Sequence, residues 1–170
     1  RGARDDLWKD STYTGDNPGT LPEVAIERHL DAYNVDIAVL TGGPYAAGVH
    51  NDPDYAAAYC RAFNDFTAEY WLAADARFRG SIHVSPMDPE LAVEEIHRLG
   101  DRPEFAQVMM AAGSRMPFGN RFYHPIYAAC QEHNLPMCVH FGAEGAGVSG
   151  PPTAAGYPTY YLEMRMARPQ

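Results

Sequence analysis

The chain has 170 residues, of which 46% are hydrophobic and 21% charged, a composition typical of a globular protein with a buried core. Its formal net charge is −9, from 22 acidic and 13 basic side chains, and such a surface would repel nucleic acids and anionic lipids. No apolar run reaches the ~18 residues that a helix needs to span a bilayer. The composition therefore argues against nucleic-acid and membrane partners.

The first part of the chain contains an irregular segment, a helix and a strand. Residues 1–19 are polar, rich in Gly, Asp and Thr, and have no sustained period, so they predict a loop. Thr20 and Glu23 form a capping-box pattern that predicts a helix start, and Asn34 can end that helix in a left-handed conformation. Residues 35–40 form a nearly continuous apolar run, which is typical of a parallel strand covered on both faces.

The rest of the chain alternates between helix and strand. Three further helices are predicted to begin at residues 52–53, 88–89 and 124–125. In each of these residue pairs the second residue is proline, which is favoured in the first turn of a helix. Three further strands are predicted, at 81–85, 105–110 and 136–140. Such strict alternation predicts a parallel α/β sheet. A segment of a (β/α)₈ barrel and an open doubly wound sheet both fit this pattern.

The three cysteines, Cys60, Cys130 and Cys138, are widely spaced and lie in apolar stretches. An odd number without a CxxC motif predicts buried thiols rather than disulfides. Because such thiols are typical of a reducing compartment, we expect a cytoplasmic protein.

His140 is the leading candidate for a functional side chain, because it ends a predicted strand. In α/β folds the carboxyl ends of the strands face the ligand. Alternation along the strand puts Cys138 and His140 on one face, and Met137 and Val139 on the other. The apolar pair suits the helix layer, so His140 is expected at the catalytic rim, where a neutral imidazole can bind a divalent metal. The alternative is a hydrogen-bonded histidine in the interior.

Three other side chains are candidates for the site. Arg115 follows the strand at 105–110, where its guanidinium could clamp a substrate carboxylate; the alternative is a surface arginine in an ion pair. His83 alternates with apolar neighbours in its strand, which permits a catalytic role, although a satisfied interior histidine explains the pattern better. Glu144 follows His140 and could face substrate or solvent.

Several segments in the same order resemble the amidohydrolase-related family (amidohydrolase 2). That family contains aminocarboxymuconate-semialdehyde decarboxylase, resorcylate decarboxylase, and various hydrolases and lactonases. The resemblance covers nearly the whole chain after about residue 20. It is carried by residues 29–40, 64–65, 75–82, 88–92, 123–127 and 135–145.

The resemblance implies a partial (β/α)₈ TIM barrel over residues 20–170, containing strands two to five and lacking the first and last strands. A complete barrel needs about 250 residues. The histidine at the position of His140 is a metal ligand in the family, so we expect a divalent metal, with zinc as the first candidate. The family's His-x-His pair is not found among the seven histidines. The remaining ligands are expected outside this chain, and the chain alone is expected to be inactive.

The implied function is that of a metal-dependent hydrolase acting on a small carboxylated organic substrate. A nonoxidative decarboxylase of the same family is the first alternative, because both reactions use the same metal constellation. A non-catalytic α/β binding module is the alternative of another class. A homo-oligomer is expected for the full-length protein.

Overall fold

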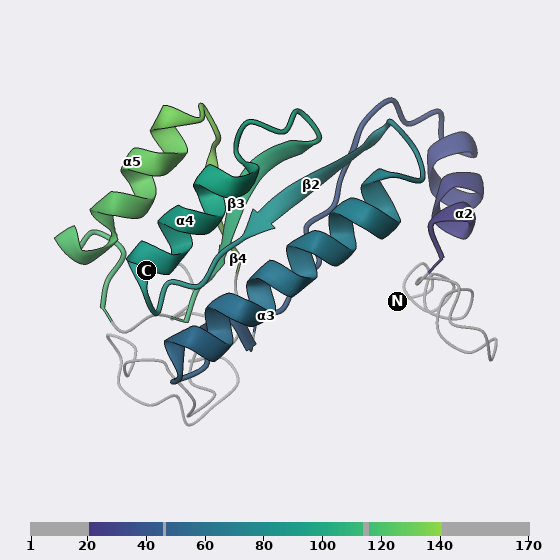
Figure 1. Ribbon diagram of the computed structural model, residues 1–170. Coiled ribbons are helices and arrows are strands. Elements are labelled where there is room, and N and C mark those ends of the chain that lie inside the picture. The colour runs from purple at the N-terminus through teal and green to yellow at the C-terminus, as the bar shows by residue number, and fades with distance from the viewer. Residues whose placement is uncertain (1–20, 46, 114–115, 141–170) are drawn as a thin grey trace, which may run out of the picture.

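The sheet of this protein has four parallel strands in sequential order. The computed structural model describes residues 21–45, 47–113 and 116–140, and all statements below concern these. The strands are β1 (Ala38–Val39), β2 (Phe78–His83), β3 (Phe105–Ala111) and β4 (Met137–His140). Each strand pairs only with its neighbours along the chain, in the order β1-β2-β3-β4. Parallel neighbours require crossover connections, and helices supply them (Figure 1).

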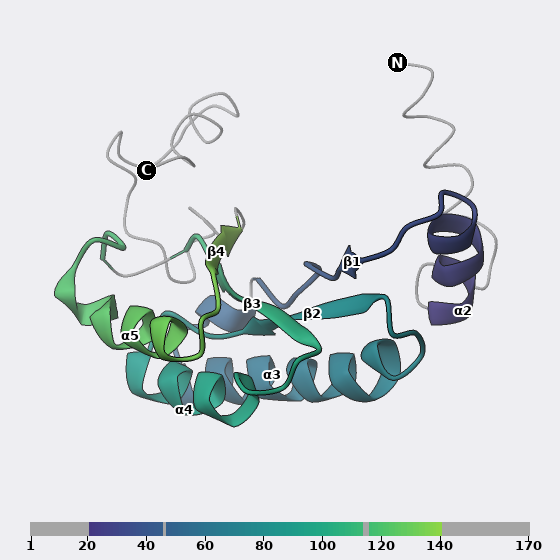
Figure 2. The same ribbon diagram turned by 90° about the horizontal axis from the view of Figure 1, so that it is seen from above.

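The long helices cover one face of the sheet, and the sheet curls away from them (Figure 2). This arrangement confirms the predicted partial (β/α)₈ barrel and rules out the doubly wound alternative, which needs helices on both faces. The helical elements are α2 (Pro22–Ala25), η2 (Ile26–Asp31), η3 (Ala47–Val49), α3 (Pro53–Phe66), η4 (Thr67–Leu72), α4 (Pro89–Leu99), η5 (Arg121–Tyr123) and α5 (His124–Glu132).

The main core lies between the sheet and these helices. Ile82, Val108 and Met110 project from β2 and β3 and pack with Ile96 and Ile126 from α4 and α5. All five side chains are fully buried. Burying an aliphatic side chain of this size contributes about 1.5–3 kcal/mol, so this layer is the main source of stability for the half-barrel.

The concave face of the sheet is polar. The Ser81 hydroxyl donates to the Leu40 carbonyl at 2.7 Å, and the Gln107 amide donates to the Ser81 hydroxyl at 2.8 Å. The Cys138 thiol donates to the Gln107 carbonyl oxygen at 3.1 Å. This chain of hydrogen bonds runs from Leu40, the residue after β1, across β2 and β3 to β4, while Met137 packs into the core behind it. Cys138 and Met137 therefore point to opposite faces, as the alternation predicts.

The helix boundaries confirm several local predictions. The Asp52 side chain accepts from the Tyr55 backbone N–H at 3.1 Å, and Asp88 accepts from Glu90 at 2.9 Å. Each aspartate thereby satisfies a backbone donor at the start of its helix. Asn134 has a φ of 53°, the left-handed conformation in which asparagine often ends a helix.

Two predictions near the beginning of the chain were wrong. Leu21, not Thr20, is the N-cap residue of α2, and no side chain caps this helix. The proline that follows favours an extended backbone at Leu21, which sets the boundary there. The strand predicted at 35–40 is only Ala38–Val39, and Val39 is 44% exposed. Within the described sheet β1 has a neighbour on one side only, so this side chain is less covered there than that of a central strand.

Candidate active site

The carboxyl ends of the four strands meet at one edge of the curled sheet, called here the rim. His83 ends β2, Ala111 ends β3 and His140 ends β4. Ala111 and His140 are register partners, so the last two strands reach the rim at the same level. In barrel enzymes the active site is built at this edge, because the loops that follow the strands converge there.

His140 lies half-buried at the rim, and its backbone is tied to β3. Its carbonyl accepts from the Ala112 N–H at 2.8 Å. Its ring is stacked on the ring of Tyr45, with a centroid separation of 4.2 Å and an interplanar angle of 9°. The structure thus places His140 at the edge where the sequence predicts it, held from below by the strand and from one side by an aromatic ring.

Tyr45 comes from the loop between β1 and α3, which crosses the rim. Its hydroxyl donates to the Thr41 carbonyl, and its backbone N–H donates to the Gly43 carbonyl at 2.9 Å. Its ring also meets His83 edge-on, at 6.0 Å between centroids. It packs against a small apolar cluster of Val49, Met87 and Ala111. Burial raises the pKa of the Tyr45 hydroxyl, so the phenol is protonated at neutral pH.

His83 is an interior residue, 4% exposed. Its ring lies directly beneath Gly43 and makes a hydrogen bond to the backbone of Gly42. Burial lowers the pKa of His83 from 6.5 to about 4; the Gly42 bond raises it and the charge of His140 lowers it. The imidazole is therefore neutral at pH 7 and supports the loop above it.

A buried polar network fixes the end of β2 from the helix side. The Asn64 amide accepts from the His83 N–H at 2.8 Å, and it donates to the His83 carbonyl at 2.9 Å and to Glu95 at 2.8 Å. Asn64 is 0% exposed and Glu95 is 6% exposed. Arg98 neutralises Glu95 at 2.6 Å and reaches Asp65 at 2.7 Å. Because charges and amides in this network are paired, it adds rigidity rather than a reactive group.

Among the residues described, the rim carries the imidazole that the sequence predicts as a metal ligand, His140. No group of three or more histidine, cysteine, aspartate or glutamate side chains in ranges 21–45, 47–113 and 116–140 could hold a metal ion. A zinc site normally needs at least three protein ligands. The described residues thus provide one imidazole, that of His140, whose chemistry suits a divalent metal, and fewer donors than a complete site needs. Arg115 and Glu144 lie outside the described residues.

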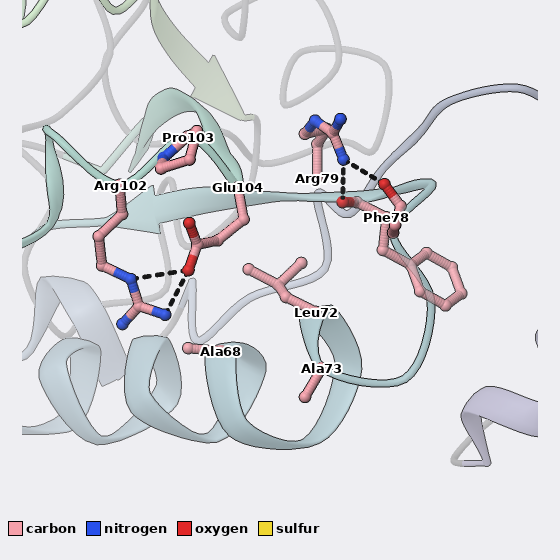
Figure 3. A pocket seen from close by; sticks show the side chains of 9 residues that line it. Ala68, Leu72, Ala73, Phe78, Arg79, Arg102, Pro103 and Glu104 are labelled. Carbon is pink, nitrogen blue, oxygen red and sulfur yellow. Dashed lines mark hydrogen bonds and ion pairs between the residues drawn. The ribbon is translucent and has the colours of Figure 1, made fainter.

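A pocket of about 410 Å³ lies at the opposite end of the sheet (Figure 3). Its walls include Arg79 at the start of β2 and the segment before β3, with Arg102 and Glu104. Arg102 donates to Glu104 at 2.8 Å, and Arg79 donates to the carbonyls of Ala76 and Phe78. Both guanidinium groups already have partners, and the strands begin rather than end here. This pocket is therefore not the candidate active site.

Two of the three cysteines do not contribute reactive thiols to the site. All three are free, and Cys60 and Cys130 are buried as predicted, whereas Cys138 is only half-buried. Burial raises the pKa of the Cys60 thiol to about 12 and that of Cys130 to about 11. A thiol is a nucleophile or metal ligand only as the thiolate, so these two are inert at neutral pH.

In the part of the chain that the structure describes, no helix is both long and apolar enough to cross a membrane.

Sequence reasoning missed two residues that build this edge, Tyr45 and Asn64. Asn64 continues the buried stripe of Ala56 and Cys60 at helical spacing, so a polar residue on the core face of α3 was a usable signal. Tyr45 stands in a Gly-Gly-Pro-Tyr loop after a strand, a pattern that marks a turn but not the contact with His140.

The chain is similar to solved structures of decarboxylases, but no curated protein matches it. One is 5-carboxyvanillate decarboxylase of Novosphingobium aromaticivorans, solved with bound manganese and 3-methoxy-4-hydroxy-5-nitrobenzoic acid. It has 28% identity and a TM-score of 0.57, over 65% of this chain and 32% of that one. The chain thus spans about one third of that enzyme's length.

Two further structures are similar in fold. The 5-carboxyvanillate decarboxylase of Sphingomonas paucimobilis has 24% identity and a TM-score of 0.55, over 67% of this chain and 34% of that one. The 2,6-dihydroxybenzoate decarboxylase of Rhizobium has 21% identity and a TM-score of 0.60, over 67% of this chain and 38% of that one.

The family model described as Amidohydrolase matches residues 8–167. This chain therefore belongs to the amidohydrolase family.

Proposed function

We propose that the intact protein is a metal-dependent decarboxylase that acts on a small aromatic carboxylate. The observation that carries this proposal is the similarity, at 28% identity, to a decarboxylase solved with manganese and a substituted benzoic acid. The sequence pattern had favoured a hydrolase, with decarboxylation as the alternative. The similar structures support that alternative better, since the three compared above are carboxylate decarboxylases.

In nonoxidative decarboxylation the bond between the ring carbon and the carboxylate breaks. The electron pair stays on the ring carbon, which takes up a proton, and carbon dioxide leaves. In our proposal His140 offers one imidazole nitrogen to a divalent metal at the rim. The metal, when bound, supplies positive charge that orients the anionic substrate and stabilises developing negative charge. The buried apolar cluster of Val49, Met87 and Ala111, against which Tyr45 packs, lies at the same edge.

Arg115 and Glu144 are proposed substrate contacts. Arg115 follows β3, which ends at the rim with Ala111, so a guanidinium there could bind a substrate carboxylate with two parallel hydrogen bonds. Lysine cannot form that bidentate contact, so Arg115→Lys is expected to raise KM more than it lowers kcat. Glu144 follows β4 closely and is proposed to contact the substrate or its water. Its replacement by glutamine should change activity without loss of metal.

The metal is proposed to be divalent, and manganese is the first to test. The sequence-based expectation was zinc, whereas the similar enzyme was solved with manganese. Activity restored to metal-free protein by manganese, and less by zinc, would support this assignment. A cytoplasmic location and a homo-oligomeric full-length protein remain predictions.

Hydrolysis is the second candidate function, because the matching family model is described as Amidohydrolase. One experiment separates the candidates. The intact protein, loaded with manganese, is incubated with hydroxylated and methoxylated benzoates, and carbon dioxide and aromatic product are both measured. Equal amounts of the two support decarboxylation. A hydrolysis product with amide or ester substrates, without carbon dioxide from any carboxylate, would favour the hydrolase. Saturable binding without turnover would favour a binding module.

A further inference from the structure

The loop between β1 and α3 reaches across the rim from the first strand to the last. Tyr45 in this loop contacts both rim histidines, His83 from β2 and His140 from β4. It also packs against the cluster that includes Ala111 of β3. One side chain of the first connection thus touches the ends of the three following strands.

The loop is held in this position by contacts on both sides of Tyr45. The hydroxyl of Tyr45 donates back to the Thr41 carbonyl, and the Gly48 N–H donates to the Pro44 carbonyl at 2.7 Å. The His83 ring supports the loop from beneath. A Cβ atom added to Gly43 would lie 2.0 Å from the His83 ring carbon Cε1, a distance that real Cβ atoms do not reach. Glycine at this position lets the backbone pass directly over the imidazole.

We infer that Tyr45 is a positioning residue for His140, holding its imidazole ring in the orientation in which it binds the metal. This inference rests on the proposed metal-dependent function and deepens it. No part of it requires Tyr45 to touch the metal or the substrate.

The stacking geometry carries the inference. A ring stacked face to face at 4.2 Å and 9° is restricted in rotation, because turning it would drive its edge into the tyrosine. The lone pair with which a neutral imidazole nitrogen binds a metal lies in the plane of the ring, so a contact with the face of the ring does not occupy it. Tyr45 therefore restrains His140 without competing for the atoms that would bind a cation. Hydrogen-bonded partners that orient a ligating histidine typically contribute 10–100-fold to metal affinity, and we expect a stacked ring to act at the lower end of that range.

The test compares manganese affinity among variants of the intact protein, measured by competition with a chelator. Tyr45→Leu removes the stacked ring, and we expect manganese binding to weaken about 10-fold. Tyr45→Phe keeps the ring and loses only the hydroxyl, so it should bind within about threefold of the wild type. Tyr70→Leu is the control, because Tyr70 is also a stacked tyrosine, on Phe66 at 5.2 Å and 22°, and lies in η4, away from the carboxyl ends of the strands.

His140→Ala separates failure of this inference from failure of the proposed function. If His140→Ala keeps full metal affinity, His140 is not a ligand and the proposed metal site is wrong. If His140→Ala loses metal but Tyr45→Leu binds as tightly as Tyr70→Leu, only the positioning role is overturned. Circular dichroism checks that each variant is folded. Should Tyr45→Leu not fold, Tyr45→Met, which fills the space with a flexible side chain, takes its place with the same expected loss.

Discussion

Replacing Asn64 with alanine should destabilise the protein far more than its single amide suggests. Asn64 is fully buried in α3, and its side chain takes the place of a neighbouring strand at the end of β2. Pairing between β1 and β2 ends at Val39 and Arg79, so β1 does not pair with His83. The Asn64 side chain instead accepts from the His83 N–H and donates to the His83 carbonyl. Alanine would leave both backbone groups buried without these partners.

The magnitude follows from these contacts. Each buried backbone group left without a partner costs about 1–3 kcal/mol. The two groups of His83 therefore predict a loss of about 4 kcal/mol, and the higher helix propensity of alanine offsets roughly 0.5 kcal/mol of it. The expected decrease in the free energy of unfolding is about 3.5 kcal/mol.

Urea unfolding followed by circular dichroism measures this decrease. Asn120→Ala is the matched control, since the exposed Asn120 side chain accepts a single bond from the Phe122 N–H at 2.9 Å. Loss of such a capping bond costs about 1 kcal/mol. If Asn64→Ala lost no more stability than Asn120→Ala, the argument that Asn64 completes the end of β2 would be refuted.

Three further predictions concern stability. Arg98→Met removes the partner of the buried Glu95 carboxylate, and urea unfolding should show a loss of about 2 kcal/mol. A hydrogen bond from the Arg77 guanidinium lowers the pKa of Asp75 from 3.8 to about 2. The stabilising effect of the ionised Asp75 is therefore complete above pH 4 and is lost as the pH falls to 2. Thermal midpoints of Asp75→Asn and wild type should therefore differ at pH 6 and converge near pH 2. Gly43→Ala should lower the thermal midpoint by several degrees, because the added Cβ atom would meet the His83 ring. Gly42→Ala is the control, since a Cβ atom there meets nothing within 4 Å. Equal midpoints of the two variants would contradict the close approach of Gly43 to the His83 ring.

Local sequence signals predicted the elements whose causes are local. Asp88 caps its helix and Asn134 ends another because each acts on backbone groups within a few residues. The order and direction of the strands were also predictable, since alternating helices and strands admit few topologies. The length of β1 was not, because the apolar run at 35–40 does not reveal how many of its residues pair with β2.

The site was predictable only in part, and for a physical reason. His140 could be placed at the rim because the end of a strand and the period of two are both visible in the sequence. Its contact with Tyr45 joins residues that lie 95 positions apart and depends on the path of a loop. The same holds for Asn64, whose bonds reach His83 across the packed interface between α3 and β2.

The most direct test of the account is the release of carbon dioxide by the intact protein and its His140→Ala variant. Both are purified, loaded with manganese, analysed for bound metal and incubated with hydroxylated benzoates. The account predicts that the wild type releases one carbon dioxide for each aromatic carboxylate consumed, and that His140→Ala loses most of its metal and this activity while remaining folded. A variant that kept full manganese occupancy and released carbon dioxide at the wild-type rate would contradict the role of His140 at the rim.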